Sequence, residues 1–434
     1  MADSSFFPAV PFAHPKLSVP PPLMMSEPGS FAHYTLTYRW GAIARRTITE
    51  NDFPSEITDQ LEQLAQNVPD GQIRLLHDNG PDLANWQHYL TPFLGQSWLQ
   101  VPWFFAEVYF YRRLLEATRY FDLNSNLAVD PFAVQKQASL EQAIDSVRQI
   151  SAQLNGWLSA SGGRSPRPAH LTALIYANLW GNRADLSLDP TATTEQIQQK
   201  VDAQASQHHI LVDQTPEVVE YLLNLHSARI DLIADNAGAE LFTDFALIDF
   251  LLATGIAHTI TLHLKAHPTF VSDATIADVQ HTLTVLSADP DSEVRSLTQR
   301  FTRYLKGDRL HLAAAPFWTE PLVFWDLSDA LTQHFTQSDL VIIKGDANYR
   351  RLLGDCAWPL TMSFADIVCY FPAPLVALRT LKSEIAAGLE PAQIAATSAT
   401  DPNWLINGHW GVIQASPLNL RFNKTIRSDA FSDS

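Results

Sequence analysis

Short apolar runs that alternate with helical stretches dominate the second half of the chain and constrain its fold most strongly. Runs at residues 230–234, 259–264, 322–325, 340–343, 367–371 and 410–414 have the length and composition of strands. Helical periodicity follows two of them, at residues 241–253 and 327–335. Because strands that alternate with helices form parallel sheets buried on both faces, we predict a three-layer α/β/α domain with a mostly parallel sheet.

The first half of the chain has helical patterning instead. Apolar residues recur at helical spacing over residues 98–118 and 140–158, and a polar, Gln-rich segment at 191–209 separates the two halves. We therefore predict an all-helical N-terminal domain, residues 1–205 with a proline-rich and loosely ordered start. An α/β domain, residues 206–434, would follow it.

The composition excludes several classes of function. With 29 basic and 46 acidic residues among 434, the net charge is 29 − 46 = −17, which is unfavourable for general binding to nucleic acid or to anionic membranes. Two cysteines are too few for a disulfide framework or a cysteine zinc site. No apolar run reaches the ~20 residues that cross a bilayer, and the N-terminus resembles no targeting peptide. We expect a cytoplasmic protein, with nuclear presence also allowed, whose partner is a small molecule and whose oligomeric state is unknown.

The pair Asp235 and Asn236 follows directly on the predicted strand at 230–234. In an open α/β sheet, ligands bind at this carboxyl end of the strands. A carboxylate beside an amide offers two oxygen ligands suited to magnesium or manganese. Gly238 would allow a close turn before the next helix. The alternative is an Asp-Asn turn that only caps that helix.

Asp273 is a further candidate ligand. It lies 273 − 235 = 38 residues after Asp235, a distance that suits one strand–helix–strand unit, so its carboxylate can return beside Asp235. The alternative is an N-cap of the helical stretch that follows it.

A basic segment, residues 344–350 with the sequence Lys-Gly-Asp-Ala-Asn-Tyr-Arg, follows the predicted strand at 340–343. Lys344 and Arg350 would carry positive charge at the carboxyl end of that strand. Arginine can hold a phosphate through two parallel hydrogen bonds, and lysine acts as a point charge. The alternative is an ordinary polar turn.

A second basic segment lies within residues 374–387, where apolar residues recur at helical spacing. Positions three apart share a helix face, so Arg379 and Lys382 can point at one anion. The alternative is a solvated basic face.

Other catalytic signals are absent or weak. The chain lacks a P-loop, a dinucleotide-binding glycine pattern and a nucleophile elbow. His263 and His267 have a zinc spacing only on a helix, but they fall in a strand-like run that Pro268 ends. We therefore interpret both histidines as structural.

Taken together, these motifs resemble the damage-control phosphatase family, and in particular its third subfamily. The resemblance rests on residues 235–240, 344–350 and 379–382, in that order and spacing, and it extends over about residues 30–414. It implies a helical N-terminal domain packed on an α/β domain with helices on both sides of its sheet. The implied reaction is hydrolysis of small phosphorylated metabolites, notably sugar phosphates such as fructose 1-phosphate. Cleavage of fructose 6-phosphate is a further possibility in the subfamily.

The resemblance also implies a site. A manganese, cobalt, nickel or magnesium ion would be held by the catalytic positions that match Asp235, Asn236 and Asp273. The substrate phosphate would contact the positions that match Asp346, Ala347, Asn348, Tyr349, Arg350 and Lys382. We hypothesise further that Lys344, Arg350 and Lys382 clamp the phosphate and that Arg379 orients it or assists. Asp346 and Asn348 would then hold the substrate and its hydroxyls.

Two other functions stay open. An S-adenosylmethionine-dependent protein carboxyl methyltransferase is the older description attached to the subfamily. Such enzymes commonly place a glycine-rich loop after the first strand, whereas residues 235–238 contain one glycine and two oxygen ligands. A non-catalytic sugar-phosphate binding protein would use the same pocket without releasing phosphate.

Overall fold

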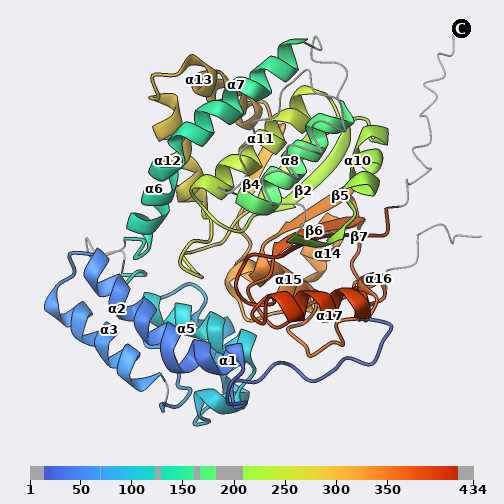
Figure 1. The fold of residues 1–434 in the computed structure, drawn as a ribbon. Helices are drawn as coiled ribbons and strands as arrows, with labels where there is room; N and C mark the ends of the chain where they lie inside the picture. The colour runs from blue at the N-terminus through green and yellow to red at the C-terminus, as the bar shows by residue number, and fades with distance from the viewer. Residues whose placement is uncertain (1–13, 69, 123–128, 161–166, 182–208, 419–434) are drawn as a thin grey trace, which may run out of the picture.

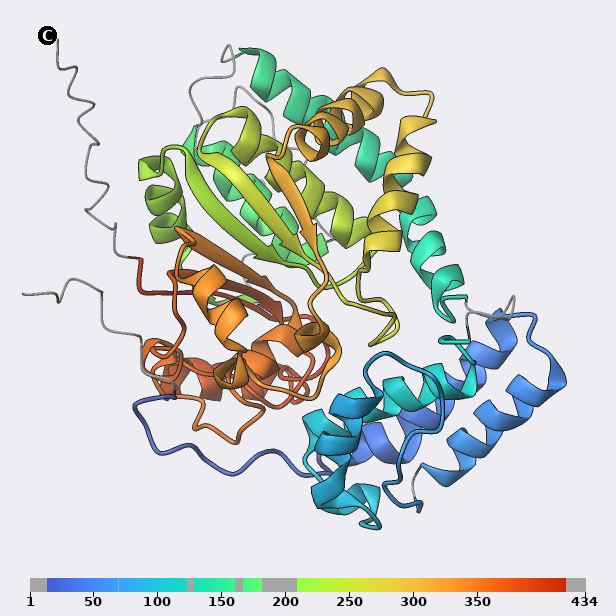
Figure 2. The same cartoon turned by 180° about the vertical axis from the view of Figure 1, so that it is seen from behind.

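A computed structural model describes residues 14–68, 70–122, 129–160, 167–181 and 209–418. Its centre is a seven-stranded sheet with the order β1-β7-β6-β5-β2-β3-β4 (Figures 1 and 2). The strands are β1 (Ile210–Asp213), β2 (Ala228–Ile233), β3 (Ala257–His263), β4 (Leu310–Ala313), β5 (Leu340–Lys344), β6 (Leu375–Thr380) and β7 (Gly411–Ser416). The pairing is parallel except between β6 and β7. The predicted, mostly parallel sheet is confirmed.

Helices cover both faces of this sheet and complete three layers. The face that carries Ile230 and Leu232 shares one apolar core with α7 (Ile144–Ala160), α8 (Pro168–Trp180), α10 (Thr215–Asn224), α11 (Ala239–Ala253), α12 (Ile276–Ser287) and α13 (Ser292–Lys306). The face that carries Val341 and Ile343 packs against α14 (Asp329–Phe335), α15 (Asp346–Leu352), α16 (Phe364–Ile367) and α17 (Pro391–Thr400). Burial on both faces explains why the strands are almost continuously apolar.

The N-terminal region is helical and has an aromatic core of its own. Its elements are α1 (Phe31–Tyr34), η1 (Thr35–Arg39), α2 (Trp40–Glu50), α3 (Ser55–Asn67), α4 (Leu83–Leu90), η2 (Thr91–Phe93), η3 (Trp98–Gln100), α5 (Trp103–Ala117) and α6 (Ala133–Gln142). In this core Trp40 stacks on Phe110 with ring centroids 5.1 Å apart. The next helices, α7 and α8, pack on the sheet instead. The predicted boundary at 205/206 and the start at residues 1–13 lie outside the described residues.

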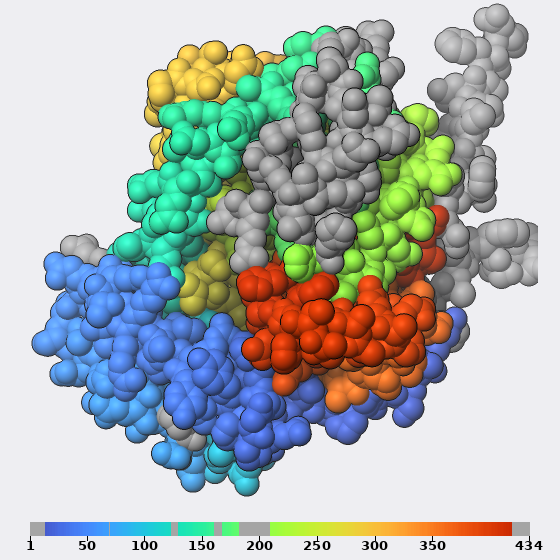
Figure 3. Space-filling view, in the orientation of Figure 1, coloured from blue at the N-terminus to red at the C-terminus, as the bar shows by residue number. Residues whose placement is uncertain are grey.

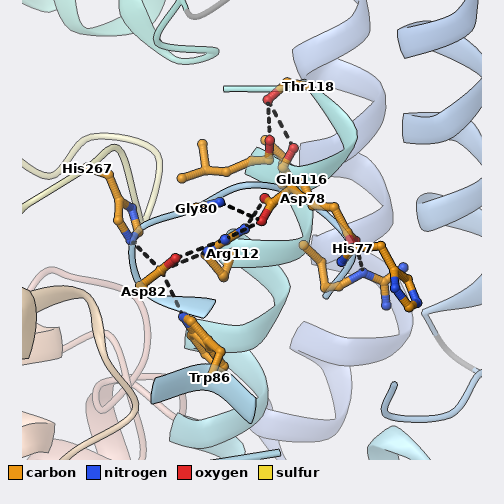
Figure 4. Close-up of polar contacts among 12 residues, drawn as sticks. His77, Asp78, Gly80, Asp82, Trp86, Arg112, Glu116, Thr118 and His267 are labelled. Carbon is orange, nitrogen blue, oxygen red and sulfur yellow. Dashed lines mark hydrogen bonds and ion pairs between the residues drawn. The ribbon is translucent and has the colours of Figure 1, made fainter. Parts of the chain in front are cut away.

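A polar network joins the helical region to the loop that follows β3 (Figure 4). Arg112 of α5 donates hydrogen bonds to Asp78 at 2.6 Å and to Asp82 at 2.8 Å. His267, in the loop after β3, points at the same Asp82, with Nε2 3.7 Å from Oδ2. Phe270 of that loop packs against Tyr111, with centroids 5.1 Å apart. The helical region therefore supports the loop that carries Asp273.

Two predicted strands are wrong. Residues 322–325 overlap a 3₁₀ helix, η7 (Phe324–Asp326), because the Asp326 carboxylate accepts from the Val323 amide and closes a turn. Residues 367–371 follow α16, whose N-cap is the side chain of Ser363. Both runs are apolar because they are wholly or partly buried, and burial alone does not distinguish a strand from a turn.

The helix predicted at 374–387 is also wrong, because β6 occupies residues 375–380. Residues 375–379 are all buried, so no polar face reveals a period of two. Consequently Arg379 lies on a strand and does not share a helix face with Lys382. Strands β1 and β4 were missed because each has only four residues. The helices predicted at 98–118 and 140–158 correspond mainly to α5 and α7.

Candidate metal and phosphate site

The predicted site residues meet at the carboxyl edge of the sheet. Asp235 and Asn236 follow β2, and Asp273 lies in the loop after β3. Helix α15 follows β5, and Lys382 follows β6. Because β6, β5, β2 and β3 are successive neighbours in the sheet, these loops lie side by side.

Backbone pairing brings Asp273 beside Asn236. The two residues form an isolated β-bridge, and the Ala274 amide donates to the Asp235 carbonyl at 2.8 Å. The N-cap of the next helix is Thr275, so Asp273 is free of the capping role that was its alternative. The separation of 38 residues therefore closes into one site.

The carboxylates of this site are buried among like charges. Burial raises the pKa of Asp235 well above its ordinary value, and the charges of Glu240 and Asp273 raise it further. Burial likewise raises the pKa of Asp273. Asp273 Oδ2 is buried without a hydrogen bond of good geometry and lies 3.3 Å from Lys265 Nζ. Burial and the neighbouring negative charges disfavour the ionised form of these carboxylates despite Lys265, and a bound cation would offset this cost.

The donor atoms fit a hard divalent cation. Asp235 and Asp273 offer carboxylate oxygens, and Asn236 offers an amide oxygen, which are ligands that magnesium and manganese accept. The Ser272 hydroxyl donates to Asn236 Oδ1 at 2.5 Å and marks the side on which that oxygen lies. These three residues would hold the metal.

A cavity of about 490 Å³ opens beside Asn236, while Asp235 and Asp273 are buried and are not part of its lining. Its lining includes Asn236, Glu240 and Lys382, together with the polar side chains of Gln142 and Asn407. In the space-filling view a hollow lies between the helical region, α6 and the C-terminal part of the chain (Figure 3). Lys382 is exposed and lines this cavity, so its ammonium group is available to an anion.

A larger cavity, of about 610 Å³, lies in the helical region away from these ligands. Its arginines Arg74 and Arg113 both pair with Glu116, at 2.7 and 2.9 Å. Because both arginines are held by a carboxylate, and Arg119 of the same lining pairs with Glu56, we do not assign the phosphate site there.

The structure gives Lys344 a role behind the ligands. Its buried Nζ donates to the Asp244 carboxylate and lies 3.2 Å from Glu240 Oε1. Burial lowers the pKa of Lys344, but the two carboxylates outweigh burial and raise it, so the group stays charged. Lys344 therefore supports Glu240, and its geometry does not favour the predicted clamp on phosphate.

Arg350 is likewise fully engaged. Its guanidinium group donates to Glu107 of α5 and to Asp355, the latter at 2.7 Å. It also stacks on Trp103 with 3.7 Å between its Cζ and the ring centroid. These contacts join the helical region to α15, so the geometry favours a structural role over the predicted phosphate contact.

Asp346 and Arg379 organise the segment that presents Lys382. Asp346 Oδ1 accepts from Arg379 Nε at 2.8 Å, from the Lys382 amide at 3.0 Å and from the Ser383 hydroxyl at 3.0 Å. Arg379 is buried and also donates to Ser383 Oγ at 2.8 Å. Both residues act on Lys382 through this segment.

The remaining predicted contacts lie on α15. Asn348 donates to the Ala234 carbonyl at 3.1 Å, which ties α15 to the end of β2. Tyr349 is buried, and its hydroxyl donates to Gln414 at 2.7 Å. Ala347 is half-buried and precedes both in sequence. The geometry of Asn348 and Tyr349 favours positioning over direct contact with a substrate.

Two charged residues of the site were missed from the sequence. Lys265 is buried after β3, and its Nζ donates to Asn348 Oδ1 at 3.2 Å and pairs with Asp273. Glu240 lines the cavity and accepts from Asn236 at 2.8 Å. A lysine that ends an apolar strand run was the available signal for Lys265, and Glu240 was part of the quoted motif without a role.

A second group of possible metal ligands comes from β2, β3 and α14. Ligand atoms of Asp231, His263 and His334 lie within 4.8 Å of one another. The Nε2 atoms of the two histidines are 2.8 and 2.6 Å from Asp231 Oδ1. Such ligands suit zinc, but the Arg229 guanidinium lies 2.8 Å from His334 Nδ1 and already supplies positive charge. We interpret this group as a hydrogen-bonded network.

The fold and site thus define an α/β protein with a carboxylate-rich ligand site at the edge of a mostly parallel sheet. Residues 35–396 match the damage-control phosphatase ARMT1-like domain. The chain therefore belongs to the ARMT1-like damage-control phosphatase family, as the motifs predicted.

Two relatives of similar length agree with this assignment. The chain is 31% identical over 427 residues to the damage-control phosphatase ARMT1 of Danio rerio, with 89% of this chain and 95% of that protein covered. It is 27% identical over 439 residues to the Homo sapiens protein of the same name, with 91% and 98% covered. A crystal structure of a DUF89 family protein from Pyrococcus horikoshii aligns with a TM-score of 0.46 and 14% identity, over 87% of this chain and 96% of that one.

Across the part of the chain that the structure describes, no helix combines the length and apolar character needed to cross a membrane.

Proposed function

We propose that the protein is a metal-dependent phosphomonoester hydrolase that acts on small phosphorylated metabolites. The observation that carries this proposal is the buried group of Asp235, Asn236 and Asp273, in which both carboxylates have raised pKa values. Holding two charged carboxylates in a buried site is unfavourable unless a cation joins them. The likeness to damage-control phosphatases supports the reaction class.

The three oxygen-bearing side chains would hold a manganese, cobalt, nickel or magnesium ion. When bound, such an ion supplies charge neutralisation for phosphoryl oxygens and Lewis-acid activation. The protein's own contribution is to fix the two carboxylates after β2 and β3 and to hold the amide oxygen of Asn236 on the side of Ser272.

Lys382 would contact the phosphoryl oxygens in this cavity. Its side chain is exposed and lines the cavity together with Asn236 and Glu240, whereas Arg46, another exposed cation of the lining, pairs with Glu50. Asp346 and Arg379 hold the backbone of this segment, so they orient Lys382 without touching the phosphate. The charges of the metal ion and of the Lys382 ammonium group, placed on different phosphoryl oxygens, would stabilise the transition state of phosphoryl transfer.

The rest of the substrate would be a small polyol such as a sugar. The cavity volume of about 490 Å³ is within the ~300–1,000 Å³ typical of small-molecule sites. Its wall contributes amide side chains from Gln135, Gln142 and Asn407, which donate to and accept from hydroxyl groups. We propose sugar phosphates, with fructose 1-phosphate tested first and fructose 6-phosphate second.

A panel of phosphorylated metabolites tests the proposal. Each would be incubated with manganese, cobalt, nickel, magnesium or a chelator, and free phosphate would be measured. We expect phosphate release that requires a divalent ion and is abolished by chelator. Substrate-induced thermal stabilisation without phosphate release would favour a binding protein instead. Tight binding of S-adenosylmethionine without metal, measured by calorimetry, would favour a methyltransferase.

A further inference from the structure

Glu240 lies between a ligand side chain and a buried ion pair. It is in the first turn of α11, and its side chain is 21% exposed at the cavity. Asn236 Nδ2 donates to its Oε2 at 2.8 Å, and Lys344 Nζ lies 3.2 Å from its Oε1. Lys344 is in turn held by Asp244. Both oxygens of Glu240 therefore accept from fixed donors.

The orientation of the Asn236 amide decides whether it can hold a cation. An amide has an oxygen end, which binds a cation, and an NH₂ end, which does not. Here the NH₂ group donates to Asp235 Oδ2 at 2.9 Å and to Glu240 Oε2 at 2.8 Å. The reverse orientation would place the amide oxygen against two carboxylates. The hydrogen bonds thus leave Oδ1 on the side of Ser272.

We propose that Glu240 is a positioning residue that fixes the amide of Asn236 with its oxygen on the side of Ser272, the residue before the candidate ligand Asp273, where it would be held ready for a cation. This inference rests on the proposed function. Groups that orient a metal ligand commonly change metal affinity about 10- to 100-fold when they are altered. The anchored chain from Asp244 through Lys344 to Glu240 keeps the carboxylate in place, because each member is bonded to the next.

The geometry also explains why a carboxylate is needed at this position. Glu240 accepts from two donors, whereas the amide of glutamine has only one accepting end. In Glu240→Gln, the new NH₂ group must face either Lys344 or the NH₂ group of Asn236. The first choice places two donors together beside a buried cation, and the second favours a flipped Asn236. Both choices disturb the ligand.

Manganese binding, measured by isothermal titration calorimetry and by the electron paramagnetic resonance of free Mn²⁺, tests this role without reference to activity. We expect Glu240→Gln to weaken binding about 10- to 100-fold. In the Asn236→Asp background the ligand is a symmetric carboxylate with no orientation to fix. There, Glu240→Gln should not weaken binding and should strengthen it, because it removes a like charge.

The matched control is Glu320→Gln. Glu320 is buried and, like Glu240, accepts from an asparagine, Asn85, at 2.6 Å, but it does not line this cavity. Its substitution should leave manganese binding unchanged. If Glu240→Gln fails to fold, as judged by circular dichroism, Glu240→Asp replaces it, because the shorter side chain cannot reach both donors.

The outcomes separate this inference from the proposed function. A wild-type protein that binds no manganese would overturn the metal site and, with it, the role of Glu240. Wild-type binding that Glu240→Gln leaves unchanged would overturn the positioning role alone. Equal weakening by Glu240→Gln in the wild-type protein and in the Asn236→Asp variant would also overturn it, because Glu240 would then act as a direct ligand.

Discussion

Gly345 lies directly against the carboxyl group of Asp235. A Cβ atom on Gly345 would fall 2.0 Å from Cγ, 2.1 Å from Oδ2 and 2.4 Å from Oδ1 of that side chain. The two residues follow β5 and β2, which are paired in the sheet. Gly345 also has a φ of +88°, a region that other residues rarely adopt. The close approach of these two strand ends therefore depends on glycine and fixes the position of the carboxylate.

Gly345→Ala should weaken metal binding. The added methyl group must displace Asp235 or the start of α15. In addition, alanine at a positive φ lowers the free energy of unfolding by about 1 kcal/mol. We expect a lower melting temperature and at least a tenfold weaker manganese affinity, measured by calorimetry. Gly95→Ala is the control, because Gly95 has a φ of +78° but nothing within 4 Å of its virtual Cβ. Equal manganese affinity in both variants would contradict the role of Gly345.

Asp235→Asn and His334→Ala distinguish the two possible metal centres. Asp235→Asn keeps the shape of the side chain but removes a ligand charge, so we expect it to abolish metal-dependent phosphate release. It should also raise the melting temperature in chelator, because it relieves repulsion among buried carboxylates. His334→Ala should leave both the bound manganese, counted by elemental analysis, and phosphate release unchanged. Loss of manganese in His334→Ala would instead place the metal at Asp231.

The sequence predicts that Asp235, Asn236 and Asp273 meet, because the signal for their positions is local. Asp235 and Asn236 follow an apolar strand, and the carboxyl ends of neighbouring parallel strands meet wherever the sheet forms. Asp273 then needs only one strand–helix–strand unit to return. These inferences require the order of elements and no knowledge of side-chain packing.

The sequence does not show in the same way which basic residues form buried ion pairs and which stay available to a phosphate. Lys344 finds Asp244 on α11, 100 residues earlier, and Arg350 finds Glu107 in the helical region, 243 residues earlier. Which positive charge stays free is therefore decided by distant carboxylates that no local motif reveals. Strand β6 could not be predicted for a related reason. It is buried on both faces, so polar and apolar residues do not alternate along it and the pattern does not indicate a strand.

Arg350→Met tests whether Arg350 is structural. The substitution leaves the buried carboxylates of Glu107 and Asp355 without their partner, which typically costs about 3–5 kcal/mol. We expect urea denaturation to show this loss, while the KM of the folded protein changes little. Arg45→Met is the control, since Arg45 is half exposed and pairs with Glu62 at the surface. A large rise in KM with unchanged stability would restore the predicted phosphate contact.

The stability of the metal-free protein should fall as pH rises. The folded-state pKa of Asp235 is raised above its unfolded value near 4, so the folded protein holds a proton that the unfolded chain releases. This contribution is complete below about pH 4 and is lost as pH rises through the folded pKa. Urea denaturation in chelator at several pH values would measure it.

Asp235→Asn provides the comparison for this pH dependence, because other groups titrate in both proteins. The stability advantage of the variant over the wild type should grow as pH rises. Manganese affinity of the wild type should rise over the same range, since binding requires the ionised carboxylate. A constant difference between the two proteins would show that Asp235 is already ionised in the folded, metal-free state.

Lys382→Met should weaken substrate binding without weakening metal binding. Methionine keeps much of the side-chain stem but removes the charge, and a hydrogen bond to a charged group contributes about 1.5–3 kcal/mol. We therefore expect KM to rise about 10- to 150-fold. Manganese affinity should hold or improve, because the positive charge of Lys382 acts on Asp235 and opposes a second cation there. Lys306→Met, an exposed lysine at the end of α13, is the control. An unchanged KM would remove Lys382 from the phosphate site, and weaker manganese binding would mean that it acts on the metal ligands instead.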